Sequence, residues 1–168
     1  RSPGAGAAPA PHFPPAPARF DRATALQGYD LAGICFHGPD VELIRTDNAP
    51  PGIFLVGWVA FQLLRERVPD LDFHATAGLS LGEFTALAAA GVMSFEDALR
   101  VVRQRGRFMQ EACESTQGGM AAIIALDEGP TREVCAESGV DLANLNCPGQ
   151  IVISGSPARI ARACGRAN

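Results

Sequence analysis

The chain has 168 residues, of which 47% are hydrophobic and 19% are charged. This composition supports a packed core and excludes a largely disordered protein. The formal net charge is −4 and no run of Lys or Arg occurs, so a nucleic-acid partner is not expected. The five cysteines are widely spaced and include no Cys-x-x-Cys pair, which indicates reduced thiols and no metal site.

The first part of the chain has an unusual composition. Residues 1–19 are mostly Ala, Pro, Gly and Ser and lack the apolar core of a secretory signal. We expect a flexible, extended segment there, with His12 in solvent. The longest apolar stretch, residues 52–64, is about 13 residues long, too short to cross a membrane. We therefore expect no membrane partner and a cytoplasmic location.

Helices dominate the expected structure from residue 20 to residue 118. We expect helices over residues 20–27, 39–45, 48–66, 83–90 and 94–113, with Gly91 ending the fourth. Ser94 and Asp97 fit the Ser-x-x-acid capping pattern that begins the fifth. Phe73 to Leu79 is a short apolar run without helical periodicity, which predicts a buried strand.

The order of the expected elements changes at Met120. We expect strands over residues 120–126, 140–145 and 151–154, and helices over 130–138 and 157–166. This β-α-β-β-α order is five-sixths of a ferredoxin-like βαββαβ unit. The chain stops where the last strand should begin, so we expect it to be truncated. The predicted fold is α/β: a flexible segment (1–19), part of a larger core (20–118) and an incomplete small subdomain (119–168).

A Gly-x-Ser-x-Gly pattern lies between the expected strand and the helix that follows it. Gly78-Leu79-Ser80-Leu81-Gly82 has the context of a nucleophile elbow, in which a sharp turn exposes the serine hydroxyl. The amide of Leu81 would then lie at a helix N-terminus, where negative charge on an attacked carbonyl oxygen is favoured. The alternative is a strand-to-helix turn whose small residues only permit tight packing.

One arginine of the fifth helix lies close to its apolar stripe. At about 100° per residue, Arg105 falls on the flank of the stripe that contains Val102 and Gly106. Arg100, Arg103 and Arg107 fall on the polar face. A guanidinium near a core face needs an anionic partner. That partner is either a protein carboxylate in a structural salt bridge or a substrate carboxylate held bidentately.

Several segments together resemble the malonyl-CoA:acyl carrier protein transacylase family. They are Gly78-Leu-Ser-Leu-Gly-Glu83, Ala90-Gly-Val-Met93, Arg105-Gly-Arg-Phe-Met-Gln110, Gly119-Met-Ala-Ala-Ile-Ile124 and Asn146-Cys-Pro-Gly-Gln150. The resemblance runs from about Phe20 to the end of the chain and implies a hydrolase-like parallel-sheet core. It also implies transfer of a malonyl group from malonyl-CoA to acyl carrier protein in fatty acid biosynthesis, through an acyl-serine and without a cofactor.

Carried over residue by residue, the resemblance makes Ser80 the nucleophile, the Leu81 amide half of the oxyanion hole, and Arg105 the ligand of the malonyl carboxylate. A branched apolar residue after the serine resembles malonyl-selective members. The chain departs from the family at four places. It lacks the early Pro-Gly-Gln-Gly loop, has Leu79 where His is usual and Pro50 where Gln is usual, and ends before the catalytic histidine, which we expect beyond Asn168.

Three other functions compete with this interpretation. A polyketide-type acyltransferase domain shares the elbow and the arginine. A serine hydrolase shares the elbow, but it has no use for a carboxylate ligand and does not need to exclude water. A non-catalytic fragment is the third, favoured by the missing histidine. We expect this chain to be impaired as an enzyme, because neither His37 nor His74 is placed to act as the base.

Overall fold

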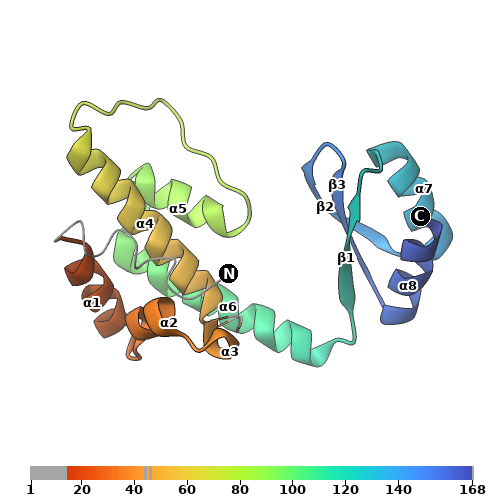
Figure 1. Cartoon of the computed structure of the whole chain (residues 1–168), viewed down its shortest axis with the longest axis horizontal. Helices are drawn as coiled ribbons and strands as arrows, with labels where there is room; N and C mark the ends of the chain where they lie inside the picture. Colours follow the sequence, from red (N-terminus) through yellow and green to blue (C-terminus); the bar gives the residue numbers. More distant parts are fainter. Residues whose placement is uncertain (1–14, 44, 46, 168) are drawn as a thin grey trace. The chain divides into compact units, whose positions relative to one another are not determined.

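The computed structural model describes residues 15–43, 45 and 47–167. The chain divides into two compact units, with the boundary between Glu111 and Ala112 (Figure 1). Most of the segment expected to be flexible, including His12, lies outside the described residues. Each unit has its own hydrophobic core and is considered by itself.

The first unit is helical throughout its regular structure. Its helices are α1 (Pro15–Gln27), α2 (Leu31–His37), α3 (Asp40–Leu43), α4 (Ala49–Arg67), α5 (Leu81–Ala89) and α6 (Phe95–Ser115), of which α6 continues into the second unit. The expected helices are present, with ends that differ by a few residues. Two differences from the sequence-based expectation, in α1 and α2, have local physical reasons.

Helix α1 begins earlier than expected, at Pro15. The prediction of a flexible segment extending to Arg19 is therefore wrong for residues 15–19. Proline is tolerated in the first turn of a helix, where its missing N–H would have no partner, and Ala16 and Ala18 favour the helical state. The proline content that suggested an extended segment thus belongs partly to a helix start.

Helix α2 was not expected from the sequence. Asp30 caps it, because the Asp30 carboxylate accepts a hydrogen bond of 2.8 Å from the backbone N–H of Gly33. Gly38, with φ +75°, follows the last residue of the helix. Leu31 and Cys35 are buried one turn apart. The Asp cap and the terminal glycine were the available signals, but the helix is too short to show a clear period.

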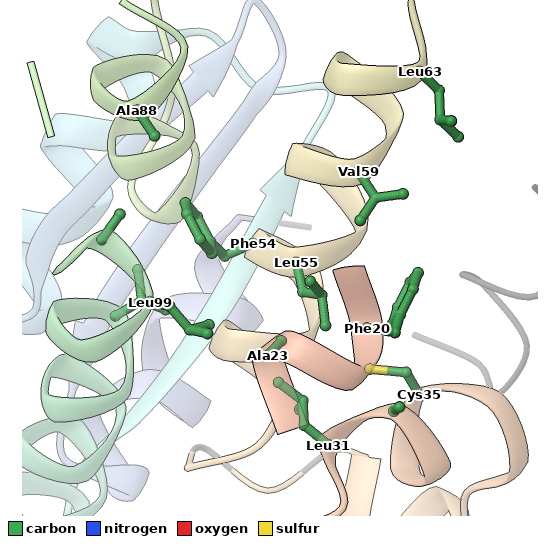
Figure 2. Close-up of a cluster of buried hydrophobic side chains, with 13 residues drawn as sticks. Phe20, Ala23, Leu31, Cys35, Phe54, Leu55, Val59, Leu63, Ala88 and Leu99 are labelled. Carbon is green, nitrogen blue, oxygen red and sulfur yellow. The ribbon is translucent and has the colours of Figure 1, made fainter. Parts of the chain in front are cut away.

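The core of the first unit joins α1, α2, α4, α5 and α6. Figure 2 shows its side chains converging from these helices. The buried members are Phe20, Ala23, Leu31, Ala32, Cys35, Phe54, Leu55, Val59, Leu63, Ala88, Ala98, Leu99 and Val102. Burying a large apolar side chain contributes about 1.5–3 kcal/mol relative to exposure, so these contacts hold α4 and α6 in one arrangement.

The segment that joins α4 to α5 is not the buried strand that the sequence predicted. Residues 72–80 are exposed and form no strand, and no backbone–backbone hydrogen bond involves Asp72 to Gly78 in the described part of the chain (Figure 1). Phe73, Ala75 and Ala77 nevertheless line a hollow of about 440 Å³ with residues of α4 and α5. A strand requires a neighbouring strand, and none of the described residues provides one.

The second unit is a small sheet with helices. Its elements are β1 (Gly119–Ile124), α7 (Glu128–Ser138), β2 (Asp141–Cys147), β3 (Gln150–Gly155) and α8 (Pro157–Arg166). The sheet is antiparallel with the order β1-β3-β2, and Ile123 lies opposite Ile151. The elements come in the β-α-β-β-α order that the sequence predicted.

A second, smaller core holds this sheet against α7 and α8. Ile123, Cys135, Val140, Ile153 and Ala163 are its buried members. Strand β1 has the alternating burial of a strand with one covered face, since Ile123 is buried while Ala122 and Ile124 are exposed. None of the described helices is long and apolar enough to cross a membrane.

Candidate active site

Ser80 lies at the sharp turn that precedes α5. Its backbone has φ 55° and ψ −107°, a region that residues other than glycine rarely adopt. Such a conformation costs about 1–3 kcal/mol and persists where the surrounding structure imposes it, often at functional sites. The sharp turn predicted from the glycine pattern is present, and Ser80 is exposed.

The first glycine of the pattern makes this turn possible. A Cβ atom on Gly78 would lie 2.1 Å from the backbone carbonyl carbon of Gly82 and 2.4 Å from the backbone nitrogen of Glu83. The chain therefore passes over the start of α5 at a distance that only glycine permits. A Cβ on Gly82 would meet nothing within 4 Å. The two glycines, which look equivalent in the sequence, thus have different roles.

The amide of Leu81 is the first N–H of α5. The next two amides are occupied, because Gly82 donates to the Leu79 carbonyl and Glu83 donates to the Ser80 carbonyl. No backbone hydrogen bond from the Leu81 N–H is found among the described residues. The first N–H groups of a helix lack partners within the helix and carry its positive end. The Leu81 amide is therefore available to an oxygen atom beside Ser80.

Helix α6 holds Arg105 in a fixed position relative to this turn. Its first turn is closed by Ser94, whose hydroxyl accepts from the Asp97 N–H at 3.1 Å and donates to the Asp97 carboxylate at 2.7 Å. Val102 and Gly106, on either side of Arg105 in the sequence, are buried. Arg105 itself is half-buried, as its place on the flank of the apolar stripe predicts.

Arg105 and Ser80 are in direct contact. The Arg105 Nη2 donates a hydrogen bond of 2.7 Å to the Ser80 Oγ, although the two residues are 25 positions apart. No salt bridge to Arg105 occurs within the described ranges, and its guanidinium is thus not neutralised by a neighbouring carboxylate. The structural salt bridge considered from the sequence is absent from this part of the chain. A half-buried cation beside a serine hydroxyl is suited to an anionic group attached to that hydroxyl.

A third residue, Phe84, lies beside Arg105 and was not predicted from the sequence. The Phe84 ring lies under the Arg105 guanidinium, with 6.0 Å between the guanidinium carbon and the ring centroid. Phe84 is four positions after Ser80, in the first turn of α5, and both side chains lie beside Arg105. That spacing was the signal that could have revealed it.

The other arginines of α6 have separate surroundings. Arg100 pairs with Asp97 at 3.0 Å, and Arg107 is exposed. Arg103, which was expected on the polar face, is half-buried. Its Nη1 donates a hydrogen bond of 2.5 Å to the Gln27 carbonyl, and its guanidinium carbon lies 5.1 Å from the centroid of the Tyr29 ring. The Arg103 side chain therefore ties α6 to the end of α1.

The histidines and cysteines do not extend the site. Neither His37 nor His74 forms a hydrogen bond with Ser80 in the part of the chain that the structure describes, and both are exposed. Burial raises the pKa of the Cys35 thiol to about 11. No group of three or more potential metal ligands occurs among the described residues.

Residues 9–167 match the family described as acyl transferase domain. The chain belongs to that family. The described turn at Ser80, with the Leu81 amide and Arg105 beside it, lies within the matched residues.

Curated relatives include bacterial malonyl CoA-acyl carrier protein transacylases. The one from Bacillus subtilis (strain 168) is 44% identical over 148 residues, which cover 85% of this acyl transferase chain and 46% of the relative. The one from Salmonella typhimurium is 40% identical over 161 residues, covering 92% and 51%. The polyketide biosynthesis protein ThaF of Burkholderia thailandensis is 44% identical over 164 residues, but the match covers 14% of its length.

Solved structures similar to this chain have the same kind of name as these relatives. The acyl-carrier-protein S-malonyltransferase from Burkholderia pseudomallei 1710b has a TM-score of 0.91 at 37% identity, covering 99% of this chain and 55% of that one. The malonyl CoA-acyl carrier protein transacylase from Coxiella burnetii has a TM-score of 0.92 at 33% identity, covering 99% and 54%. This acyl transferase chain spans about half the length of the transacylases it matches.

Proposed function

We propose that this acyl transferase chain carries the acylation site of an enzyme that moves a malonyl group from coenzyme A to acyl carrier protein in fatty acid biosynthesis. The observation that carries the proposal is the 2.7 Å hydrogen bond from Arg105 to the Ser80 hydroxyl. It brings an unneutralised guanidinium to the atom that would bear the acyl group. The names of the relatives support malonyl-CoA as donor and acyl carrier protein as acceptor.

The chemistry follows from the three groups at the turn. The Ser80 Oγ attacks the thioester carbonyl carbon of malonyl-CoA, and the serine proton passes to a base that the described residues do not supply. The Leu81 amide donates to the oxyanion, the carbon–sulfur bond breaks and the coenzyme A thiol leaves. Arg105 binds the free carboxylate of the malonyl ester. The carrier thiol then attacks the ester and regenerates Ser80.

We also propose the finer features of the fold. The unpaired backbone of Asp72 to Gly78 favours a role as a strand of a hydrolase-like parallel sheet, with further polypeptide as its neighbour. The order β1-β3-β2 is that of the first three strands of a ferredoxin-like subdomain. On this basis we propose that the described residues from 20 to 118 belong to the large core and those from 119 to 167 to the ferredoxin-like small subdomain.

The carrier protein could belong to fatty acid or polyketide synthesis. A solved structure with a TM-score of 0.91 at 34% identity is a malonyl-transacylase in complex with a type II PKS acyl-carrier protein, and it too is about twice as long as this chain, which covers 55% of it. The polyketide protein ThaF is as similar as the Bacillus subtilis transacylase, at 44% identity, but this chain covers only 14% of ThaF and about half of the transacylases. The transacylases therefore support fatty acid synthesis as the first choice. The serine hydrolase alternative leaves the unneutralised Arg105 without a purpose.

The proposal is tested by acylation of Ser80. The chain is incubated with malonyl-CoA, and malonyl ester formation is followed by intact mass and peptide mapping. We expect slow labelling at Ser80, because general-base assistance is typically worth about 10²–10⁴-fold and the described histidines do not contact the serine. Ser80→Ala should abolish the label, whereas Ser156→Ala, another exposed serine before a helix, should retain it. Labelling that persists in Ser80→Ala would refute the nucleophile.

A further inference from the structure

The contact between Arg105 and Phe84 has a consequence for donor selectivity. Arg105 interacts with two side chains, one at the elbow and one in α5. Its Nη2 lies 2.7 Å from the Ser80 Oγ, and its guanidinium carbon lies 6.0 Å from the centroid of the Phe84 ring. The backbone of α6 fixes only the start of the Arg105 side chain. Without these two interactions the rest of the side chain could adopt several rotamers. Ordering an arginine side chain costs up to about 2 kcal/mol of conformational entropy.

The Phe84 ring is itself fixed. It is half-buried and packs against the core cluster of the first unit, which includes buried residues of both α4 and α6. The backbone of α5 holds it about one turn from Ser80. Phe84 therefore connects the position of the guanidinium to the same rigid core that positions the serine.

An aromatic ring holds a guanidinium without consuming its charge. A carboxylate in the place of Phe84 would neutralise Arg105 and occupy its N–H donors. A ring attracts the cation through its quadrupole, worth about 0.5–1 kcal/mol at exposed sites, and takes no hydrogen bond from it. The N–H groups on the edge of the guanidinium then remain available for two parallel bonds to a carboxylate.

We propose that Phe84 is a positioning residue that holds Arg105 toward Ser80 and thereby sets the preference for acyl groups that end in a carboxylate. This inference rests on the proposed malonyl transfer. It predicts that loss of the ring weakens recognition of the carboxylate and leaves acylation by groups without a carboxylate unchanged. The phenol ring of tyrosine should substitute for the phenyl ring.

The first test measures selectivity at Ser80. Labelling rates with malonyl-CoA and acetyl-CoA are compared for the original chain, Phe84→Leu, Phe84→Met and Phe84→Tyr. We expect the malonyl-to-acetyl ratio to fall about fivefold in the Leu and Met variants and to be retained in Tyr. The matched control is Phe95→Leu, because Phe95 packs against the same core through Trp58 and Phe54. It should lower thermal stability without changing the ratio.

The second test does not require catalysis. Arginine Nε–Hε signals are recorded by NMR, with the Arg105 signal assigned as the one lost in Arg105→Lys, and free malonate is added. We expect Phe84→Leu to move the Arg105 signal and to weaken the apparent malonate affinity about fivefold, and Phe95→Leu to do neither. An unmoved Arg105 signal with unchanged malonate affinity in Phe84→Leu would overturn the inference.

The two tests separate this inference from the proposed function. If malonyl labels Ser80 and Phe84→Leu keeps the full malonyl-to-acetyl ratio, malonyl transfer stands and the positioning role of Phe84 is wrong. If no donor labels Ser80 but malonate binding at Arg105 still depends on the Phe84 ring, the positioning role stands and the transfer is wrong. Equal losses with both donors in Phe84→Leu would show a structural role only.

Discussion

At the residue scale, the proposed function depends most on Arg105. In the described part of the chain it contacts a serine hydroxyl and an aromatic ring, and it has no carboxylate partner. If the proposed function is right, this cation would discriminate between acyl groups by charge. A malonyl ester on Ser80 would bring a carboxylate to the guanidinium, whereas an acetyl ester would bring none.

The first prediction concerns Arg105→Ala. Truncating one member of a desolvated charge pair costs roughly 2–5 kcal/mol, so malonyl labelling of Ser80 should become at least about thirtyfold slower. Acetyl labelling should change little or improve. The measurement is the rate of mass increase with each donor. Arg107→Ala, which removes an exposed arginine of the same helix, is the control. Equal losses with both donors would make Arg105 a structural residue.

The second prediction uses the two glycines beside Ser80. Gly78→Ala would put a Cβ 2.1 Å from the backbone of Gly82, so the turn must shift and Ser80 must leave its geometry. Gly82→Ala has open space and should be tolerated, with a small gain in helix propensity. We expect Gly78→Ala to lose Ser80 labelling and Gly82→Ala to keep it. Labelling of Ser80 that is lost in Gly82→Ala and retained in Gly78→Ala would contradict the geometry of this turn.

At the scale of the elements, α2 and α4 enclose Cys35. The thiol is 4% exposed, and a Cβ on Gly52 of α4 would lie 3.0 Å from its sulfur. Burial raises its pKa from 9.0 to about 11 because the thiolate would lose hydration. The exposure of the Cys35 thiol therefore depends on how closely α2 packs against α4 at Gly52.

The third prediction follows from this thiol. At pH 8 Cys35 is protonated and should resist iodoacetamide, while the exposed Cys113 and Cys147 react. Labelling of Cys35 should appear only when urea opens the core. The folded pKa is the higher one, so the contribution of this thiol to stability is complete below about pH 9 and is lost as the pH rises through about 11. Labelling of Cys35 as fast as Cys113 in native buffer would show that the core is open.

At the scale of the whole molecule, the segment that joins α4 to α5 is the least protected stretch among the described residues of the first unit. Its residues Asp72 to Gly78 have no backbone hydrogen bonds to other described residues, and they are exposed. Exposed backbone without hydrogen bonds is the preferred site of proteolysis. The turn at Ser80 lies directly after it, so cleavage there would separate α4 from Ser80.

The fourth prediction is the site of first cleavage. Limited chymotrypsin treatment should cut after Phe73, which is 36% exposed, before it cuts after Phe54, which is fully buried in the core. The products are identified by mass. If a further polypeptide pairs with Asp72 to Gly78 as a neighbouring strand, it should slow cleavage after Phe73. Such slowing would support the proposed parallel sheet. First cleavage within α4 would show that the core is less stable than the segment.

Several features were determined by the sequence itself. The periodicity of residues 94–113 predicted a helix with Arg105 on the edge of its buried stripe, and Ser94 with Asp97 predicted its start; the observed helix is Phe95–Ser115. The glycine pattern predicted the sharp turn at Ser80. These succeeded because helix capping, helical periodicity and left-handed turns depend on residues close together in the chain.

Only the tertiary structure decided the other features. It brought Arg105 to Ser80 across 25 residues, showed that the guanidinium has no carboxylate partner in the described part of the chain, and revealed Phe84 beneath it. It also showed that the apolar run from Phe73 to Leu79 is not a strand here. Strand formation and ion pairing depend on partners distant in the sequence, and a pattern of residue types does not specify which partners are within reach.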